Sequence, residues 1–312
     1  MEKPKKIPLF VNPLSRKNRM QKGASIRAFQ KMGGQRIQVI APADFDELDR
    51  AVLRCREESV PYVAISGGDG TIHQVLTRFI VHYRDAPIPP VLILKDGTMN
   101  NISVTIDLKG SGNSILKRFL AAQDGNAELR IEQRNTIRIG DRYCFIFGNG
   151  LATNVLDAVY EGDNKGFLKR LRVVMLAIGE CITNTGNPVF FKRLRGRVSL
   201  DGNLLPCEDF VGVLAGTVET VGMGFRPLAP MYPGERSFHV IATALRPREM
   251  LKYFFKLRKG RPIRSLRHFY AHVSELRLES PEPFSYTMDG DLYRCDGTLL
   301  VEMGPVVSLV YV

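Results

Sequence analysis

The segment Tyr62–Leu76 constrains the fold of this chain more than any other, because a short apolar run is followed directly by a glycine-rich turn and a helical pattern. Three glycines stand within four residues of the turn, and they let the backbone bend sharply and approach a ligand closely. After the turn, apolar residues recur at one-face helical spacing: Ile72, Val75, Leu76, Phe79 and Ile80. The segment therefore predicts a strand, a tight turn and a helix whose first N–H groups can face an anion.

The first ~130 residues repeat this alternation of strand and helix. The apolar runs are residues 7–11, 37–40, 62–65 and 91–94, and the helical patterns between and after them include 45–58 and 114–122. Such alternation is typical of a parallel sheet with helices on both faces, in which ligands bind beyond the carboxyl ends of the strands. We predict an α/β nucleotide-binding domain over residues 1–130, with residues 304–312 as a candidate last strand of it.

Residues 131–303 have a different sequence pattern, in which short β-like runs dominate. We predict a mainly antiparallel β-rich domain for them, interrupted by two helices at about 167–182 and 248–259. Asp201-Gly202 is a hairpin-turn signal. The predicted strands are 136–139, 143–147, 190–194, 197–200, 210–215, 238–242, 273–278, 299–302 and, at the end of the chain, 306–312.

The composition excludes several classes of protein. No apolar run approaches the ~18–20 residues that a membrane span needs, and the basic N-terminus lacks a signal-peptide pattern. The five cysteines are scattered and form no CxxC, which predicts a reduced, cytoplasmic chain without disulfides or a zinc cluster. His268 and His272 have no third ligand near in sequence, so we interpret them as ordinary histidines. A net charge of +12 favours anionic partners: nucleotide phosphates, nucleic acid or anionic lipid headgroups.

The glycine-rich turn contains side chains that could take part in a reaction. Thr71 can cap the following helix or hold a phosphate oxygen. Asp69 is unexpected beside a phosphate, because two negative charges repel each other unless a cation or a proton donor intervenes. Its position indicates Mg²⁺, directly or through water, or activation of a substrate hydroxyl. A tight turn with an acidic helix cap is the alternative. The turn is neither a Walker A loop nor GxGxxG.

Gly67–Thr71, GGDGT, resembles the signature of the diacylglycerol kinase catalytic domain family, which includes bacterial lipid kinases, sphingosine kinases and ceramide kinases, with NAD kinases and phosphofructokinases as distant relatives. Four further segments strengthen the resemblance to the lipid-kinase branch. Asn12–Ser15 is similar to NPxSG, Asp96–Asn101 to GTGND, Gly224–Pro230 to GGGFxxAP and Met288–Asp291 to DGE. The resemblance thus covers essentially the whole chain.

The resemblance implies an α/β domain and a β-rich domain with the active site in the cleft between them. It also implies ATP and Mg²⁺ as cofactors and a lipid alcohol as substrate. Asp69 would organise the phosphates and Mg²⁺, the latter through water, and Asp291 would accept the proton of the substrate hydroxyl. These two are the predicted catalytic residues. The predicted nucleotide-binding residues are Asn12, Ser15, Arg16, Gly67, Gly68, Asp69, Gly70, Thr71, His73, Thr98 and Asn100.

The chain departs from the family pattern at several positions. Arg16 replaces a glycine, His73-Gln74 replaces an Asn-Glu pair, and Asn101 replaces an aspartate. Gly234–Ser237 lacks the acidic residues that hold a structural Mg²⁺ in bacterial members. Asp291 stands where the family has glutamate, which retracts the carboxylate by roughly 1.5 Å. We therefore predict a lipid kinase and keep two alternatives: a NAD kinase-like small-molecule kinase, and a catalytically weak relative that binds nucleotide or lipid.

A basic segment, Arg246–Arg267, contains nine Lys or Arg and one acidic residue, with aromatic and aliphatic residues interleaved. It is typical of an amphipathic helix at an anionic membrane surface, which predicts peripheral membrane contact. The alternative is a helix that packs its aromatic side on the β-rich domain. No nucleic-acid-binding motif accompanies the charge, so we predict no nucleic-acid partner. The sequence leaves the oligomeric state open, a dimer included.

Overall fold

The computed structural model describes residues 5–13, 23–95, 102, 104, 108–126, 128–161, 167–183, 188–222, 225–229 and 235–312. The chain forms two compact units. The N-terminal unit comprises Met1–Thr136, Asp141–Tyr143 and Pro305–Val312, and the C-terminal unit comprises Ile137–Gly140 and Cys144–Gly304. The predicted division of function between residues 1–130 and 131–303 stays a prediction.

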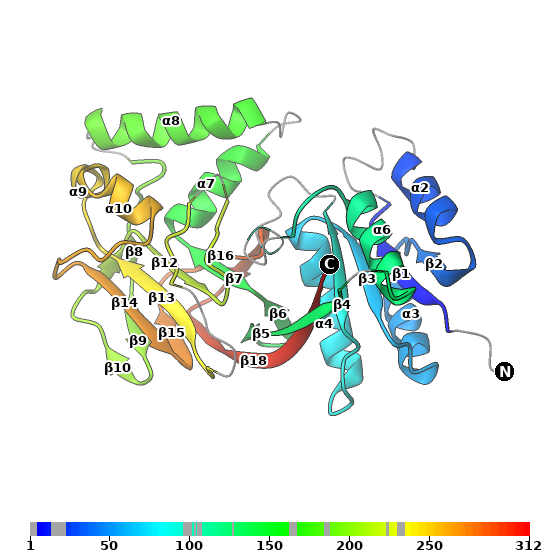
Figure 1. Ribbon diagram of the computed structural model, residues 1–312. Helices are drawn as coiled ribbons and strands as arrows, with labels where there is room; N and C mark the ends of the chain where they lie inside the picture. The colour runs from blue at the N-terminus through cyan, green and yellow to red at the C-terminus, as the bar shows by residue number, and fades with distance from the viewer. Residues whose placement is uncertain are drawn as a thin grey trace. The chain divides into compact units, whose positions relative to one another are not determined.

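A parallel sheet is the centre of the N-terminal unit, with the strand order β4-β3-β1-β2 (Figure 1). The last part of the long strand β18 pairs in parallel with the outer edge of β4. The strands are β1 (Ile7–Val11), β2 (Ile37–Ile40), β3 (Val63–Gly67), β4 (Val91–Lys95) and β18 (Thr298–Tyr311). Every residue of β1 and β3 is buried, as expected for strands of a parallel sheet covered on both faces.

Helices connect the parallel strands. They are α2 (Ala24–Gly33), α3 (Phe45–Glu57), α4 (Asp69–Tyr83) and α6 (Gly112–Gln123), with a short 3-10 turn, η1, at Gly34–Arg36. The chain runs outward from β1 to β2 and then back to β3 and β4, so right-handed crossovers place α2 on one face of the sheet and α3 and α4 on the other. Accordingly α2 packs against α6, and α3 against α4.

The apolar stripe of α4 faces the sheet, as its spacing predicts. Its five predicted positions are all buried, and Phe79 meets Phe10 of β1 edge to face, with ring centroids 5.5 Å apart. Such aromatic pairs add about 0.5–1.5 kcal/mol to the free energy of burial. The packing fixes the direction of α4, and with it the position of the glycine-rich turn at its start.

Antiparallel sheets form the C-terminal unit. Six strands take the order β14-β13-β12-β7-β16-β17, while β9, β10, β15 and the first part of β18 form a second antiparallel set in the order β10-β9-β15-β18. The bounds of the strands are β7 (Ile146–Asn149), β8 (Leu194–Arg195), β9 (Arg197–Leu200), β10 (Asn203–Leu204), β11 (Asp209–Phe210), β12 (Gly212–Gly216), β13 (Phe238–Thr243), β14 (His268–Val273), β15 (Glu275–Glu279), β16 (Phe284–Met288) and β17 (Asp291–Cys295). β8 and β11 form a separate short pair.

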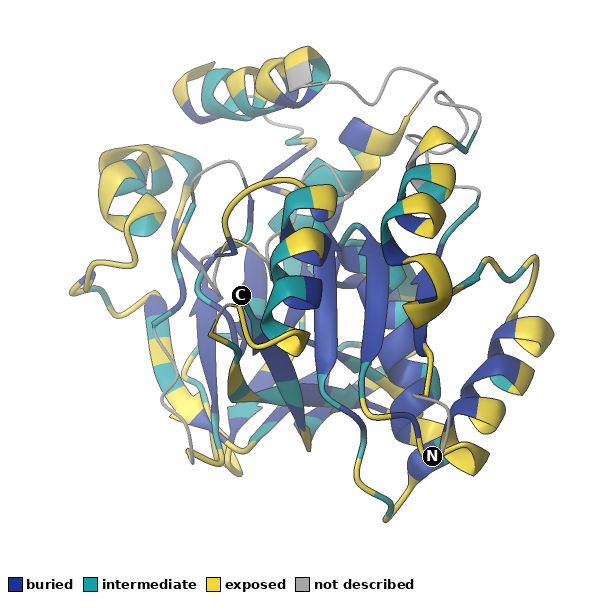
Figure 2. Ribbon diagram, turned by 45° about the vertical axis from the view of Figure 1, so that its right-hand side comes forward, coloured by how far each residue is buried: buried dark blue, intermediate teal, exposed yellow. Residues whose placement is uncertain are grey.

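The described residues of this unit form the helices α7 (Leu151–Tyr160), α8 (Phe167–Thr183), α9 (Pro247–Lys252) and α10 (Phe254–Arg258). The chain passes between the two units through β5 (Arg130–Ile139) and β6 (Arg142–Cys144), and again through β18. Figure 2 shows the same pattern of burial in both units: dark blue strands lie inside and the yellow faces of helices lie outside. This α/β-plus-β architecture confirms the predicted fold class.

Several local predictions were wrong. Phe190–Leu194 is not a strand: its two phenylalanines are buried in a bend beside α7 and α8, and only Leu194 begins β8. The helix expected over 248–259 is two helices, α9 and α10, that meet at Tyr253. The strand predicted over 273–278 spans the end of β14 and most of β15. The two strands predicted over 299–302 and 306–312 are parts of one long strand, β18. The Asp201-Gly202 hairpin is confirmed, because both residues have positive φ and Leu200 pairs with Asn203.

Candidate functional site

The carboxyl edge of the parallel sheet brings together three segments of the candidate site. Val11 pairs with Ser66, and Gly67 pairs with Lys95, so β1, β3 and β4 end at the same level. Asn12 directly follows β1, and the glycine-rich turn directly follows β3. This is the edge where α/β folds bind their ligands.

The glycine-rich turn forms the start of α4. Gly68 is the N-cap residue and has extended backbone angles, and as a glycine it makes no side-chain cap hydrogen bond of its own. A Cβ on Gly67 would lie 2.4 Å from Cβ of Thr71, so this position has no room for a side chain. Asn12 donates from Nδ2 to Oγ1 of Thr71 at 3.5 Å. Two predicted nucleotide-binding segments, far apart in sequence, therefore meet at one helix N-terminus.

Asp69 is the first residue of α4 and is 6% exposed. Its Oδ1 accepts the N–H of Ile102 at 3.4 Å. A carboxylate is favoured at this position because the N-terminus of a helix carries partial positive charge. Within the part of the chain that is described, no group of three His, Cys, Asp or Glu side chains could hold a metal ion. A single carboxylate next to a phosphate site still fits Mg²⁺, which commonly keeps several waters and binds one or two carboxylates together with substrate phosphates.

His73 lies one turn further along α4 and is 1% exposed. Its Nδ1 is 2.7 Å from the carbonyl oxygen of Tyr143, so Nδ1 carries the hydrogen. Thr77 also contacts Tyr143, donating to its carbonyl oxygen at 3.2 Å and accepting its N–H at 3.1 Å. Both side chains therefore connect α4 to β6, and the predicted contact of His73 with a nucleotide stays a prediction.

Four predicted nucleotide-binding residues, Ser15, Arg16, Thr98 and Asn100, lie outside the described residues. Lys95, which is not among the residues predicted from the sequence, ends β4 in register with Gly67. Its Nζ donates to the carbonyl oxygen of Leu108. The only sequence signal for Lys95 is its position, directly before Asp96–Asn101 and at the carboxyl end of a buried strand.

The second acidic segment forms the tip of the β16–β17 hairpin. Asp289 and Gly290 both have positive φ, 49° and 96°, and Met288 pairs with Asp291 across the turn. Asp289 is 4% exposed, and its carboxylate accepts the N–H groups of Phe145 and Ile146.

Asp291 is only partly buried at the start of β17. Tyr160, the last residue of α7, donates its hydroxyl to the carbonyl oxygen of Gly290 at 3.0 Å. The two aspartates thus differ in role: Asp289 holds the hairpin in place, and the side chain of Asp291 remains accessible. That the side chains of Asp69 and Asp291 share one cleft stays a prediction.

A glycine-rich helix start at the carboxyl edge of a parallel sheet, in a chain that continues into an antiparallel unit, defines an α/β-plus-β protein whose candidate ligand site lies at that edge. Residues 6–129 match the family model of the diacylglycerol kinase catalytic domain. A protein of Staphylococcus aureus strain MRSA252 named "Putative lipid kinase" is 21% identical over 238 residues, which cover 75% of this chain and 72% of that protein. A protein of the same name from strain Newman matches with the same identity and coverage.

Solved structures show the same fold. The crystal structure of a "putative diacylglycerol kinase" from Bacillus anthracis matches with a TM-score of 0.73 at 14% identity and covers 98% of this chain and 97% of that one. Another structure, of "diacylglycerol kinases" from the same organism, has a TM-score of 0.65 at 13% identity with the same coverage. Residues 6–129 are therefore similar to the diacylglycerol kinase catalytic domain, and the fold of the chain is similar to that of these solved structures. None of the helices in its described ranges is long and apolar enough to cross a membrane.

Proposed function

We propose that this protein transfers the γ-phosphoryl group of ATP to a hydroxyl group of a diacylglycerol- or sphingosine-like lipid. The observation that carries the proposal is the start of α4, where the glycine-rich turn, Asn12 and buried Asp69 meet. The N–H groups at the start of α4 bind phosphate oxygens, and the absence of a side chain at Gly67 leaves the helix start undistorted. Phosphoryl transfer depends mainly on such positioning and on neutralising charge.

Asp69 would hold Mg²⁺ beside the phosphates, and the ion would supply positive charge there. The N–H of Ile102 fixes the carboxylate of Asp69, so the side chain is oriented before any ligand binds. Asp291 accepts the proton of the lipid hydroxyl. Its partial exposure on a hairpin held by Asp289 supports this role, because a general base must reach the proton that it removes.

The test measures transfer from radiolabelled ATP to diacylglycerol, sphingosine, ceramide and phosphatidylglycerol in mixed micelles. We expect Asp69→Asn and Asp291→Asn to lower kcat by about 10²-fold or more, because general base catalysis and charge positioning each contribute on that order. The matched control is Asp296→Asn, whose side chain is 83% exposed just beyond the end of β17. It should leave kcat within about two-fold, as surface substitutions do.

Unchanged transfer in both active-site variants contradicts the proposed roles. Formation of NADP from NAD, with no lipid phosphorylated, assigns the chain to small-molecule kinases instead. Calorimetric binding of ATP without turnover of any alcohol assigns it to the nucleotide-binding relatives that lack activity.

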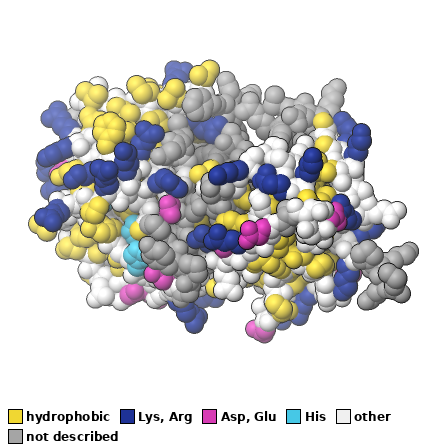
Figure 3. Space-filling model, in the orientation of Figure 1, with side chains coloured by type: hydrophobic (Ala, Val, Ile, Leu, Met, Phe, Trp, Pro, Cys, Tyr) yellow, Lys and Arg dark blue, Asp and Glu magenta, His cyan; other side chains and the backbone are white. Residues whose placement is uncertain are grey.

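The proposal includes contact with an anionic bilayer, for which α8 provides an apolar surface. Leu168, Met175 and Ile182 of α8 are each more than half exposed. α9 packs against α8, and the segment that starts there carries the nine basic residues of 246–267. Figure 3 shows hydrophobic side chains among Lys and Arg in this region, at the upper left. Apolar side chains flanked by basic ones suit the interface of an anionic membrane.

Sedimentation with vesicles tests this contact. We expect Leu168→Ser with Met175→Ser to weaken binding to phosphatidylglycerol-containing vesicles by about 30-fold or more, because each loses roughly 1 kcal/mol or more of apolar burial. The control, Leu204→Ser, changes a residue of β10 that is 58% exposed. Equal binding of both variants contradicts the membrane role of α8.

A further inference from the structure

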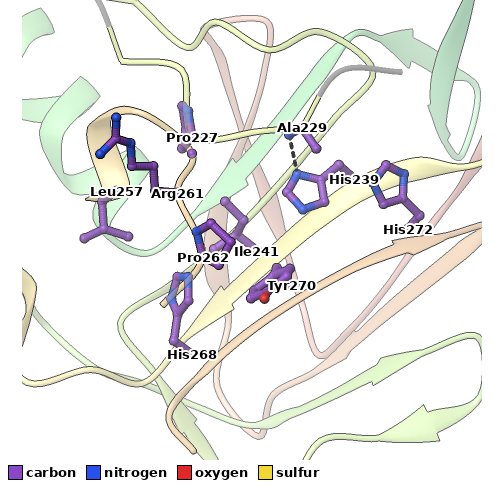
Figure 4. Close-up of a pocket in the computed structure, with 11 residues that line it drawn as sticks. Pro227, Ala229, His239, Ile241, Leu257, Arg261, Pro262, His268, Tyr270 and His272 are labelled. Carbon is purple, nitrogen blue, oxygen red and sulfur yellow. Dashed lines mark hydrogen bonds between the residues drawn. The ribbon is translucent and has the colours of Figure 1, made fainter. Parts of the chain in front are cut away.

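One face of the β13–β14 pair carries three histidines around a cavity. The register pairs His239 with His272, and side chains at alternate positions share a face of a sheet. His268 and Tyr270 therefore lie on the same face as His272. The loop that contains Arg261 crosses this face and closes a cavity of about 230 Å³ (Figure 4). None of its lining residues belongs to the glycine-rich turn.

His239 offers the cavity one fixed hydrogen-bond donor. The residue is 5% exposed, and its Nδ1 accepts the N–H of Ala229 at 2.8 Å (Figure 4). A nitrogen that accepts is unprotonated, so in the neutral ring Nε2 carries the hydrogen. Burial first, and then the charges of His272 and His268, lower the pKa of His239 to about 4, so the ring is neutral at pH 7. A metal on Nε2 would require the ring to lose its last hydrogen, so Nε2–H acts as a donor and His239 is not a metal ligand.

His268 brings a buried nitrogen that lacks a partner. The residue is 7% exposed, and among the described residues no group hydrogen-bonds to its Nδ1. Burial lowers the pKa of His268 to about 4, so this ring is also neutral at pH 7. A buried polar atom without a partner costs about 1–3 kcal/mol. A polar ligand group in the cavity removes that cost.

The mouth of the cavity is positively charged. Arg261 and His272 are exposed there, and Tyr270 is 51% exposed. The side chains that line the cavity, as far as the chain is described, include no carboxylate. Arg261 belongs to the basic segment 246–267, which has nine cationic side chains and a single acidic one. An anion is therefore attracted to this mouth, whereas a cation is repelled.

We propose that this cavity binds a phosphate group, either of a free phosphomonoester or of the headgroup of an anionic lipid. The exposed guanidinium of Arg261, which points away from His239 in Figure 4, turns to pair with the phosphate at the mouth, and the Nε2–H of His239 donates to the phosphate inside the cavity. The volume lies under the roughly 300–1,000 Å³ of ordinary small-molecule pockets, which suits a headgroup rather than a larger ligand. The site lies in the C-terminal unit and does not depend on the proposed kinase activity.

The decisive experiment compares two arginines of the same loop. Arg261 lines the cavity and Arg264 does not, and both are exposed, so Arg261→Gln and Arg264→Gln remove the same charge with little risk to folding. Glycerol 3-phosphate is titrated into the full chain and followed by the NMR signals of the histidine side chains. Vesicles of phosphatidylcholine, with and without phosphatidic acid, are tested by sedimentation.

We expect Arg261→Gln to weaken phosphate binding by about ten-fold or more, because a hydrogen bond to a charged group contributes about 1.5–3 kcal/mol, and Arg264→Gln to change it by no more than about two-fold. Saturable binding of glycerol 3-phosphate with this pattern identifies a soluble ligand. If only the vesicles that contain phosphatidic acid bind, and Arg261→Gln but not Arg264→Gln weakens that binding, the ligand is a lipid headgroup.

Binding that is equal in both variants, or absent in both assays, overturns the proposal. A zinc titration that saturates and shifts the His239 and His268 signals also overturns it, in favour of a metal site. His239→Asn is a second check, because its side-chain oxygen can still accept the Ala229 N–H while the Nε2–H donor is lost. This variant should bind phosphate at least about five-fold more weakly, on the order expected for one lost hydrogen bond.

Discussion

Asp289 allows a quantitative test of how the β16–β17 hairpin is held. Its Oδ1 accepts the N–H of Ile146 at 2.8 Å and that of Phe145 at 3.1 Å, and both donor residues are buried. Asp289→Ala leaves two buried N–H groups without this acceptor, at about 1–3 kcal/mol each. Alanine at a φ of 49° adds about 1 kcal/mol of backbone strain. We expect the free energy of unfolding to fall by about 3–7 kcal/mol in total.

Asp289→Asn separates the hydrogen bonds from the charge. Asparagine keeps one side-chain oxygen as acceptor and tolerates positive φ, so we expect a loss of only about 1 kcal/mol. Asp296→Ala removes an exposed carboxylate just after β17 and should change stability by no more than about 0.5 kcal/mol. Urea unfolding followed by circular dichroism measures all three. A loss below about 1 kcal/mol for Asp289→Ala, or equal losses for Ala and Asn, refutes the assignment of these bonds.

The remaining predictions concern other sites. Gly67→Ala should abolish ATP binding measured by calorimetry and destabilise the fold by about 1–3 kcal/mol, because its Cβ would lie 2.4 Å from that of Thr71. Near-normal affinity for ATP would contradict the close approach of Thr71 to Gly67. Asp291→Glu should retain lipid phosphorylation where Asp291→Asn loses it, since the longer side chain keeps the base; equal loss in both would exclude a general base at this position. Tyr83→Phe should leave stability unchanged or slightly raised in urea unfolding, because its buried hydroxyl has no partner among the described residues. His239 and His268 have pKa values lowered to about 4, so both are protonated more readily in the unfolded chain, and the free energy of unfolding should decline as the pH falls from 6.5 to 4. His268→Asn should reduce that decline. A variant whose stability depends on pH as that of the unchanged protein does would contradict the burial of the His268 ring.

In the N-terminal unit, the local spacing of apolar residues was sufficient to predict the main strands and the helix α4. The strands β1 to β4 and the helix α4 follow from apolar runs and one-face spacing that agree with local propensity, so little else competes with them. The position of Asp69 at the helix start follows from the glycines alone. The contact between Asn12 and Thr71 was predictable only through the family resemblance, because the two residues lie on different strand–helix units.

The C-terminal unit shows where pattern fails. Phe190 and Phe191 have high β propensity, yet they fill a hydrophobic cluster beside α7 and α8 because burial outweighs propensity. No clear sequence signal indicated that the predicted helix divides at Tyr253. The helix α7 likewise had no clear signal in the sequence. The histidine cavity is another example: the spacing of His268 and His272 was visible, but His239 joins them only through strand pairing.

The end of β18 sets the order in which the protein is able to fold during synthesis. Leu309 and Val310 pair with Val91 and Leu92 of β4, which are fully buried, although most of the chain separates the two strands. Until those last residues emerge from the ribosome, one edge of β4 has open N–H and carbonyl groups that another chain could bind. The strand β4 is therefore translated well before its partner residues in β18, and in that interval its open edge is a site where the chain can aggregate or bind a chaperone.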